Sequence, residues 1–521
     1  MKAKNIFKFK FDQLLDKLNL RQSPRKRMLR RVGFFLIFLT IIIAIFSYFT
    51  NPFVRFSLVK DPYAIVIIED SKISVTSGEN ILLKEGRHID LAAKLKSGWH
   101  ILSSRFSGGK KASSNTVDEI INEIHLVRFD PDLPYLISGD HFSVLYPRSL
   151  GIFYHSLLDD RTALSETDWQ NRQIIYLKTL AYASNVYSQS EQLSTTIVPV
   201  GPGSVALMNI YAVPSDTLYS LLFAYQQLID NSYQRENYPY DNGVSYDLQT
   251  VSAAEDLLAL HNDDLERHYI SFKNYAYNEQ TGLIKKDILL SGTKDIMKKY
   301  GAFYDNVVFW KTTQLAQFLG VIEEDQQWLD QYKQRIIDTY WLDDQGHFLE
   351  DLSNESLSEK WYSSDWLIAF QTGFLDPDSE TDRLYLTRTV NYIQRNAIDK
   401  PFAMQYSPDN RRDRMYGLVK WFSPEYGATA IWSNWGMEYT KLLIRLADVE
   451  QQVEYLEQAK SHLDAYTFNM KRYQGYPEVY DQEGDFYKTP LYKSIRRTGW
   501  VVTFEQAREM YKDLNKDFSL L

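Results

Sequence analysis

The chain has 521 residues, of which 44% are hydrophobic, enough for one large core or two to three ordinary domains and too many for a disordered protein. Its formal net charge is −9 and it contains no cysteine, which excludes a disulfide framework, thiol chemistry and Cys-ligated zinc. Aromatic residues reach 15%, more than packing alone would select, which favours a ligand with flat faces that stack on rings.

Residues 32–50 form an uncharged run that is long enough, as a helix, to cross a bilayer once. The preceding tail, residues 1–31, carries eleven Lys and Arg against two Asp, so the positive-inside rule keeps it cytoplasmic. We therefore expect a single-pass cell-membrane protein with its C-terminal part outside. A cleaved signal peptide is the alternative, although no A-x-A-like site ends the run. The tail is either an amphipathic helix on the inner leaflet or a disordered basic segment.

The part outside the tail is acidic. The tail contributes +9 to a total of −9, which leaves −18 for the rest of the chain. This charge argues against nucleic acid or a wall polyanion as a partner, and an exported chain without cysteine suggests a bacterial surface protein. Within residues 51–135, short β-branched runs alternate with turn residues as far as Phe129, which predicts a small β-rich membrane-proximal module.

Residues 136–521 have the periodicity of amphipathic helices. Behind Ser215, which suits an N-cap, apolar residues recur at helical spacing from Leu218 to Ile229. Similar patterns predict helices over residues 169–187, 250–275, 306–320, 326–341, 384–398, 428–447, 451–468 and 500–514. No segment between them alternates long enough to predict a sheet.

A short sequence pattern recurs between the helices: an aromatic residue, then a polar turn, then glycine. It begins at Tyr277, Tyr340, Tyr406 and Tyr480, at a spacing that holds two helices and their loops. Helical hairpins of this kind need neighbours to bury their second face. We expect close to six hairpins that close into an (α/α)6 toroid, whose loops converge on one mouth; an open solenoid is the alternative.

Three stretches resemble the six-hairpin glycosidases, the (α/α)6 toroids that include glucoamylases and the amylo-α-1,6-glucosidase part of glycogen-debranching enzymes. They begin at Thr281 (TGLIKKDILLSGTKDI), at Tyr426 (YGATAIWSNWG) and at Gly475 (GYPEVYDQEGDFY). The resemblance implies a mainly α toroid, with Asp295 as general acid and Glu478 as general base of a glycoside hydrolase. The chain departs from the family in having Thr293 where the debranching motif has tryptophan, and it lacks the doubled glutamate of glucoamylases.

The residue chemistry agrees with that implication. Glycoside hydrolysis needs one protonated and one ionised carboxyl, which lie about 6.5–9.5 Å apart when the reaction inverts the anomeric centre. Glu478 lies among Tyr476, Pro477 and Tyr480, a setting expected to desolvate the carboxyl and raise its pKa. The alternatives are a surface loop acid for Glu478 and, for Asp295, a carboxylate that favours a helix N-terminus.

Further residues lie in candidate mouth loops and are predicted to bind substrate. The acids Asp241, Asp365 and Glu425 stand in aromatic loops, Asp365 also suiting an N-cap, and either of Asp241 and Glu425 is an alternative base. Arg148 is expected either to hold a sugar hydroxyl or to form a structural salt bridge. Indole faces stack on sugar rings, so the tryptophans of these loops are candidates too, with core packing as the alternative: Trp361, Trp366, Trp421, Trp432 and Trp435.

Motifs that are missing narrow the choice of function. The sequence has no dinucleotide fingerprint, P-loop, HExxH or GxSxG, and its nine histidines show no ligand spacing, so we expect no cofactor and no metal. The sequence therefore predicts a membrane-anchored, extracytoplasmic glycoside hydrolase that acts on an oligo- or polysaccharide, with inversion. A non-catalytic glycan-binding or envelope-assembly protein on the same toroid is the alternative, followed by a toroidal polysaccharide lyase. The sugar and the oligomeric state stay open.

Overall fold

The computed structural model of the protein is mainly α-helical. It describes these residues: 31–41, 56–60, 65–69, 72–76, 108–129, 133–139, 144–159, 162, 165–201, 204–209, 212–235, 244–293, 297–409, 411–416, 420, 423–490 and 492–518. The chain forms two compact units, Met1–Val54 and Arg55–Leu521.

In the first unit, residues 31–41 are helical. No helix among the described residues combines the length and the apolarity that crossing a bilayer requires. Residues 42–50 of the expected anchor lie outside the described part of the chain, so the transmembrane segment stays a prediction.

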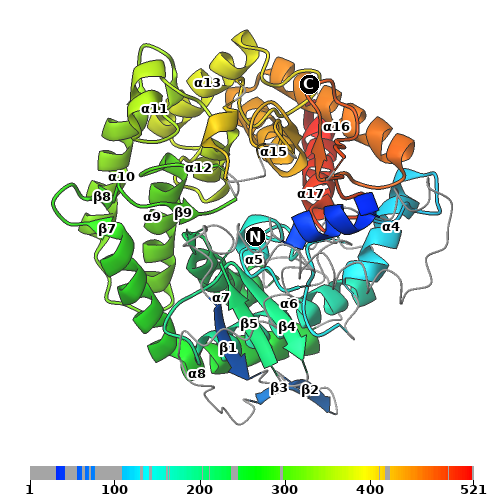
Figure 1. Ribbon diagram of the computed structural model, residues 1–521. Coiled ribbons are helices and arrows are strands. Elements are labelled where there is room, and N and C mark those ends of the chain that lie inside the picture. Colours follow the sequence, from blue (N-terminus) through cyan, green and yellow to red (C-terminus); the bar gives the residue numbers. More distant parts are fainter. Residues whose placement is uncertain are drawn as a thin grey trace, which may run out of the picture. The chain divides into compact units, whose positions relative to one another are not determined.

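The second unit is built from outer and inner helices that alternate along the chain (Figure 1). The described helices pair as α4 (Val117–Arg128) with α5 (Ser149–Ile152), α6 (Glu166–Tyr187) with α7 (Thr217–Arg235), α8 (Val244–Ala276) with α9 (Phe303–Phe318), α10 (Gln326–Tyr340) with α12 (Ile368–Gln371), α13 (Glu380–Arg395) with α15 (Ser433–Glu450), and α16 (Val453–Tyr473) with α17 (Val501–Phe518). The inner helices pack on one another in the order α5, α7, α9, α12, α15 and α17.

The first and last hairpins close the ring. The rings of Phe153 and Trp500 stack with their centroids 4.4 Å apart, next to the inner helices α5 and α17. Behind them, Nε2 of His125 on α4 lies 2.7 Å from a carboxylate oxygen of Glu505 on α17, and both side chains are buried. This closure excludes the open solenoid, whose end helices would not meet.

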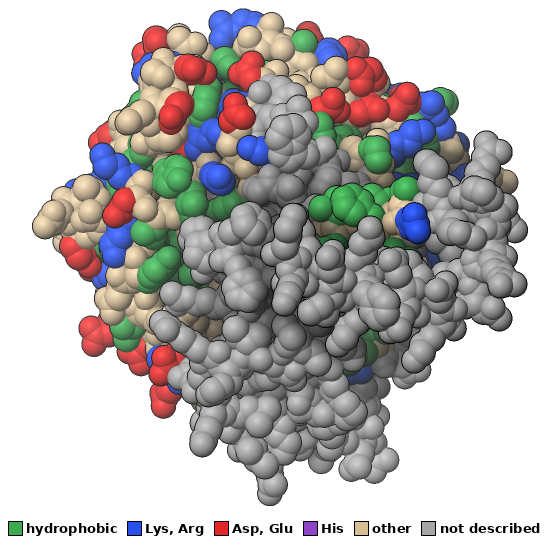
Figure 2. Space-filling model, viewed as in Figure 1, with side chains coloured by type: hydrophobic (Ala, Val, Ile, Leu, Met, Phe, Trp, Pro, Cys, Tyr) green, Lys and Arg blue, Asp and Glu red, His purple; other side chains and the backbone are tan. Residues whose placement is uncertain are grey.

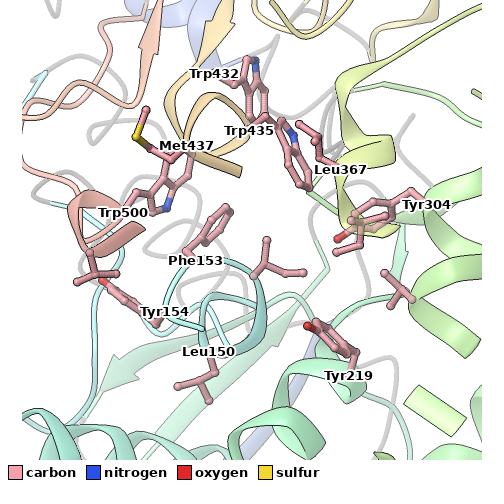
Figure 3. Close-up of a cluster of buried hydrophobic side chains, with 14 of the residues drawn as sticks. Leu150, Phe153, Tyr154, Tyr219, Tyr304, Leu367, Trp432, Trp435, Met437 and Trp500 are labelled. Atoms are coloured by element: carbon pink, nitrogen blue, oxygen red, sulfur yellow. The ribbon is translucent and has the colours of Figure 1, made fainter. Parts of the chain in front are cut away.

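Apolar side chains from the inner helices meet in one buried cluster (Figure 3). Each inner helix, or a residue next to it, contributes to the cluster: Leu150, Phe153, Tyr154, Tyr219, Tyr304, Leu367, Trp432, Trp435, Met437 and Trp500. Burial of such side chains stabilises the fold by about 1.5–3 kcal/mol each, so the cluster holds the inner ring together.

The long helices predicted from periodicity are confirmed, with ends within about six residues of those expected. The strand-like interpretation up to Phe129 is wrong for α4. Thr116 caps this helix by accepting a hydrogen bond from the backbone of Glu119, and Ile120, Ile121 and Ile124 form its buried face. The sequence signal for this helix was a capping box, Thr116 with Glu119, followed by isoleucines at helical spacing.

The expectation of no sheet between the helices is also wrong. Strands β4 (Thr196–Gly201) and β5 (Ser204–Met208) form an antiparallel hairpin that lies between α6 and α7 in the chain. Both strands are nearly continuous apolar runs, and such a run carries no alternation. Strand β1 (Phe56–Lys60) pairs with β5, so part of the expected membrane-proximal segment joins the sheet of the helical unit. The division into four domains stays a prediction.

Shorter elements complete the second unit. They are β2 (Ile65–Glu69), β3 (Lys72–Thr76), β6 (Val213–Pro214), β7 (Tyr277–Asn278), β8 (Leu283–Ile284), β9 (Leu290–Ser291), β10 (Trp341–Leu342), β11 (His347–Phe348), α11 (Asn354–Glu359), η2 (Ser364–Leu367), η3 (Arg412–Arg414), β12 (Ile431–Trp432) and β13 (Val479–Tyr480). The pair β12 and β13 is antiparallel and joins the start of α15 to the segment between α16 and α17.

Buried histidines should make the fold sensitive to acid. Burial is the main cause that lowers the pKa of His268 and His347 to about 4 and that of His462 to about 3. The unfolded chain then binds more protons than the folded one below about pH 6.5, so each histidine removes up to about 1.4 kcal/mol of stability per pH unit on acidification. We predict that the melting temperature falls steadily from pH 7 to pH 5.

The variant His268→Gln tests the cause. Glutamine can keep the hydrogen bond that Nε2 of His268 makes with the carbonyl of Tyr187 at 3.0 Å, but it does not titrate. The fall in melting temperature between pH 7 and pH 5 should therefore be shallower in the variant. An unchanged slope would show that other groups cause the acid sensitivity.

Candidate active site

The inner helices start at one end of the ring, and that end is where the polar side chains gather. Arg148 precedes α5 and forms a salt bridge with Asp216, which precedes α7. Tyr304 in the first turn of α9 donates a hydrogen bond to the same aspartate, at 2.9 Å. Lys299, just before α9, contacts Asp365 at the start of η2 and α12. The N-terminal ends of neighbouring inner helices are thus linked by polar contacts.

The helices differ in how their first turns are capped. The outer helices α4, α6, α10 and α13 begin with a side chain that bonds a free backbone N–H of the first turn. The inner helices α5, α9, α12 and α15 have no such cap bond. Backbone carbonyls bond N–H groups at the starts of these helices instead: those of Tyr146 and Pro147 for α5, Glu350 for α9 and Glu478 for α15. The outer helix α16 also begins without a side-chain cap bond.

Arg148 lies in a structural cluster. Its side chain is fully buried and contacts Asp216 (3.1 Å), the carbonyl of Gly292 (2.6 Å) and the hydroxyl of Ser291 (2.9 Å). These contacts favour the structural salt bridge that the sequence left as the alternative to sugar binding. The cluster fixes the segment before α9 against the starts of α5 and α7.

A second buried cluster surrounds Asp365. The ammonium group of Lys299 lies 2.6 Å from Asp365 and 2.8 Å from Glu350, and the guanidinium of Arg411 contacts Glu350. Burial alone would raise the pKa of Glu350, but Arg411 and Lys299 outweigh it and hold the pKa at about 2. Asp365 also accepts hydrogen bonds from Ser363 (2.5 Å) and Tyr406 (3.2 Å). Glu350 is therefore held in the ionised form.

The two predicted tryptophans near Asp365 pack on protein groups. The ring of Trp361 lies under the guanidinium groups of Arg411 and Arg414, with distances of 4.6 and 4.7 Å to its centroid. Trp366 is buried, and its indole N–H donates to the hydroxyl of Tyr362 at 2.9 Å. Both contacts correspond to the packing alternative.

Glu478 has a different environment. It directly precedes β13, and its carbonyl accepts hydrogen bonds from the backbone N–H (3.0 Å) and hydroxyl (2.9 Å) of Ser433, the first residue of α15. One oxygen of its carboxylate accepts a hydrogen bond from Tyr426 (3.0 Å) and the other from Tyr492 (3.1 Å). The side chain is 8% exposed. The structure therefore places Glu478 at the N-terminal end of an inner helix, between phenol hydroxyls.

Trp432 and Trp435 flank this position. Trp432 packs against Tyr426 with ring centroids 4.9 Å apart, and its indole N–H donates to the carbonyl of Tyr426 at 2.7 Å. Trp435, in the first turn of α15, lies in the cluster of Figure 3, and its indole N–H has no partner among the described residues. Trp432 thus fixes the tyrosine that bonds Glu478.

Glu425 precedes Tyr426 and is partly exposed. Burial, followed by the charges of Glu483 and Asp481, raises the pKa of its carboxyl above the ordinary value. It is the predicted alternative base, and the structure brings its loop beside Glu478 through Tyr426.

Three predicted site residues, Asp295, Asp241 and Trp421, lie outside the described residues. The flanks of Asp295 are described. Thr293 is buried next to the hydroxyl of Tyr304, and Met297 forms a backbone bridge with Met415.

Sequence reasoning missed several polar groups at this end. Asp216 directly precedes α7, and Asp305 lies in the first turn of α9, a position where acids are common. Lys299 and Glu350 meet across more than 50 residues of chain, and no local pattern signals that contact. No sequence pattern linked Tyr492 to Glu478, because the two residues lie on separate turns of the chain.

Comparisons with known proteins concern the fold. No family model matches the sequence, and a search of curated proteins finds no match. Among solved structures, a rhamnosidase from Klebsiella oxytoca with rhamnose bound is similar, at 12% identity over 78% of this chain and 66% of that chain, with a TM-score of 0.46. A GH63 mannosylglycerate hydrolase from Thermus thermophilus, in complex with Tris and D-glycerate, matches at 11% identity over 76% and 99%, with a TM-score of 0.45.

A sugar epimerase from a ruminal bacterium matches at 10% identity over 80% of this chain and 98% of that chain, with a TM-score of 0.43. All three scores lie below 0.5. The ring architecture is therefore assigned from the order and pairing of this chain's own helices, and a glucoamylase or debranching type is not shown.

The Lys299 cluster should be essential to stability. Replacing Lys299 with methionine leaves the buried carboxylates of Glu350 and Asp365 facing each other without their shared cation, a change that typically costs about 3–5 kcal/mol. We predict a clear fall in the midpoint of urea unfolding for Lys299→Met. The matched control is Lys460→Met, which breaks an exposed pair with Asp464 and should cost less than about 1 kcal/mol. Equal effects would contradict the role of the cluster.

Proposed function

We propose that the protein is a glycoside hydrolase in which Glu478 is the general base and Asp295 the general acid, acting with inversion on an oligo- or polysaccharide. The observation that carries the proposal is the setting of Glu478. Its two carboxylate oxygens accept hydrogen bonds from the uncharged hydroxyls of Tyr426 and Tyr492. The setting of Glu478 thus combines burial with hydrogen bonds that orient both carboxylate oxygens.

Glu478 is the acid for which we propose a role in proton transfer. Glu350, which lies elsewhere at this end of the ring, contacts the buried cations Arg411 and Lys299, and they hold its pKa at about 2. The tyrosine hydroxyls that bond Glu478 are uncharged and orient both of its carboxylate oxygens. Such a carboxylate can accept a proton from a water molecule during the reaction.

In the proposed reaction one carboxyl gives up a proton and the other takes one up. Asp295 donates its proton to the oxygen of the leaving sugar as the bond from that oxygen to the anomeric carbon breaks. Glu478 removes a proton from water, and the water oxygen forms the new bond to the anomeric carbon from the opposite face.

Aromatic groups beside Glu478 support a carbohydrate substrate. Trp432 and Tyr426 pack with Tyr492, whose ring centroid lies 5.2 Å from that of Tyr426, and all three side chains are buried. The C–H faces of sugars bind such rings, and an apolar wall with a few polar groups is the usual composition of a sugar site. The acidic, anchored chain of the sequence prediction would present this site outside the cell membrane.

We predict that Glu478→Gln lowers kcat for glycan hydrolysis by about 100-fold or more, because glutamine cannot take a proton from water. The melting temperature should stay close to that of the wild type, since the amide oxygen can still accept one tyrosine hydrogen bond. A panel of oligosaccharides, with released reducing sugar as the readout, measures the effect. Glu457→Gln on the exposed face of α16 is the matched control and should be fully active.

The stereochemistry and the acid can be tested on the same substrate. Proton NMR of the first product should show the anomer opposite to that of the cleaved bond, and Asp295→Asn should abolish hydrolysis of substrates with poor leaving groups most strongly. Retention of configuration would contradict the assigned base. Binding of the panel without any hydrolysis by the wild type would favour the non-catalytic glycan-binding alternative.

A further inference from the structure

The described residues on either side of Asp295 are held by arginines from other parts of the ring. The carbonyl of Gly292, three residues before Asp295, accepts a hydrogen bond from Arg148 at 2.6 Å. The carbonyl of Lys298, three residues after Asp295, accepts two hydrogen bonds from the guanidinium of Arg414, at 2.6 and 3.0 Å. One arginine therefore fixes the chain before the proposed general acid, and another fixes the chain after it.

Arg414 joins three loops at the end of the ring where the inner helices start. It ends η3, in the loop between α13 and α15, whereas Lys298 lies in the loop before α9. Its guanidinium also bonds the carboxylate of Asp351, which follows β11, and the backbone N–H of Tyr300 donates to that carboxylate at 2.9 Å. Asp351 is fully buried, and the side chain of Arg414 is 12% exposed.

Backbone contacts accompany the ion pair. The N–H of Lys298 donates to the carbonyl of Arg414 at 2.8 Å. Met297 and Met415 form an antiparallel bridge, and both side chains are buried. The main chain that follows Asp295 is thus paired with the main chain of the loop that carries Arg414.

The indole of Trp361 orients the guanidinium of Arg414. The guanidinium lies over the indole ring, 4.7 Å from its centroid, and the indole N–H donates to Glu359 at 2.7 Å. A guanidinium is planar, and its N–H groups form a rigid fork that bonds several acceptors at once while it stacks on an aromatic face. A lysine in place of Arg414 carries the charge but cannot reproduce this geometry.

We propose that Arg414 is a positioning residue for Asp295, the general acid of the proposed hydrolysis. Two residues of chain span at most about 7 Å, so the place in which Met297 is held limits the region that the carboxyl of Asp295 can reach. A general acid must lie within hydrogen-bond distance of the oxygen that it protonates, and a misplacement of about 1 Å lowers the rate by roughly 100-fold. The inference rests on the proposed function, because it concerns the acid of that reaction.

Two leaving groups separate a misplaced acid from general damage to the site. The leaving oxygen of an oligosaccharide needs a proton, whereas the glycosyl fluoride of the same sugar releases fluoride with little help from an acid. We predict that Arg414→Lys lowers kcat for the best hydrolysed oligosaccharide of the panel by about 10-fold or more. For the fluoride, kcat should fall by less than about threefold. The variant keeps a cation beside Asp351, so it should fold.

The matched control is Arg388→Lys. Arg388 also bonds the side chain and the carbonyl of an aspartate, Asp343, and it lies over an indole, 5.2 Å from the centroid of Trp341. It belongs to the outer helix α13, over which acidic and basic side chains are interspersed (Figure 2). This variant loses contacts of the same kind on an outer helix and should hydrolyse both substrates at the wild-type rate.

Hydrogen exchange followed by mass spectrometry tests the contact without any substrate. The amides of Lys298 and Tyr300 bond Arg414 and Asp351 in the wild type. In Arg414→Lys, a peptide that contains residues 297–300 should exchange at least about fivefold faster, because these hydrogen bonds open more often. Arg388→Lys should leave the exchange of this peptide unchanged.

Several results would overturn the inference: an equal loss for the oligosaccharide and the fluoride in Arg414→Lys, no loss for either, or unchanged exchange of residues 297–300. The two proposals fail in different ways. If Asp295→Asn loses the oligosaccharide and spares the fluoride while Arg414→Lys shows no such selectivity, only the positioning role is wrong. If the wild type hydrolyses neither substrate, or Asp295→Asn affects both equally, the proposed function is wrong in its reaction or its acid, and the positioning role falls with it.

Discussion

The meeting of the first and last hairpins is the contact on which the rest of the fold depends. Phe153 stacks on Trp500, and His125 bonds Glu505, so the segment around α5 lies directly against α17. Without this contact the inner helices would form an open row, and their N-terminal ends would not face a common centre. Closure also buries the apolar cluster of Figure 3, since each inner helix supplies part of it.

At the N-terminal end of the ring, the acidic side chains differ in the groups that contact their carboxylates. Arg148 binds Asp216, while Lys299 and Arg411 bind Glu350 and Asp365, and these pairs fix the loops before α7, α9 and α12. The carboxylate of Glu478 accepts hydrogen bonds from Tyr426 and Tyr492. The same end of the ring thus holds acids that are bound to cations and one acid, Glu478, whose carboxylate oxygens accept hydrogen bonds from phenol hydroxyls.

The sequence was sufficient for the helices that are long and amphipathic, and for the conclusion that they form hairpins. α5 and α12 were missed because four residues are too few to show a period of 3.6, and α4 because its isoleucine run was interpreted as strand. For the site, the aromatic setting of Glu478 was visible as GYPEVYDQEGDFY. The tyrosines that bond it come from residues 426 and 492, and only the paired strands β12 and β13 and the turn of residues 487–494 bring them there.

The order of helices around the ring has a consequence for synthesis of the protein. The first hairpin contacts α17 through His125 with Glu505 and through Phe153 with Trp500, and α17 begins roughly 350 residues after α5 in the chain. At about 5–20 residues per second, the ribosome needs roughly 20–70 seconds to make that stretch. During this interval Phe153 lacks the ring of Trp500 on which it stacks, so the early hairpin exposes apolar surface until the ring of helices can close.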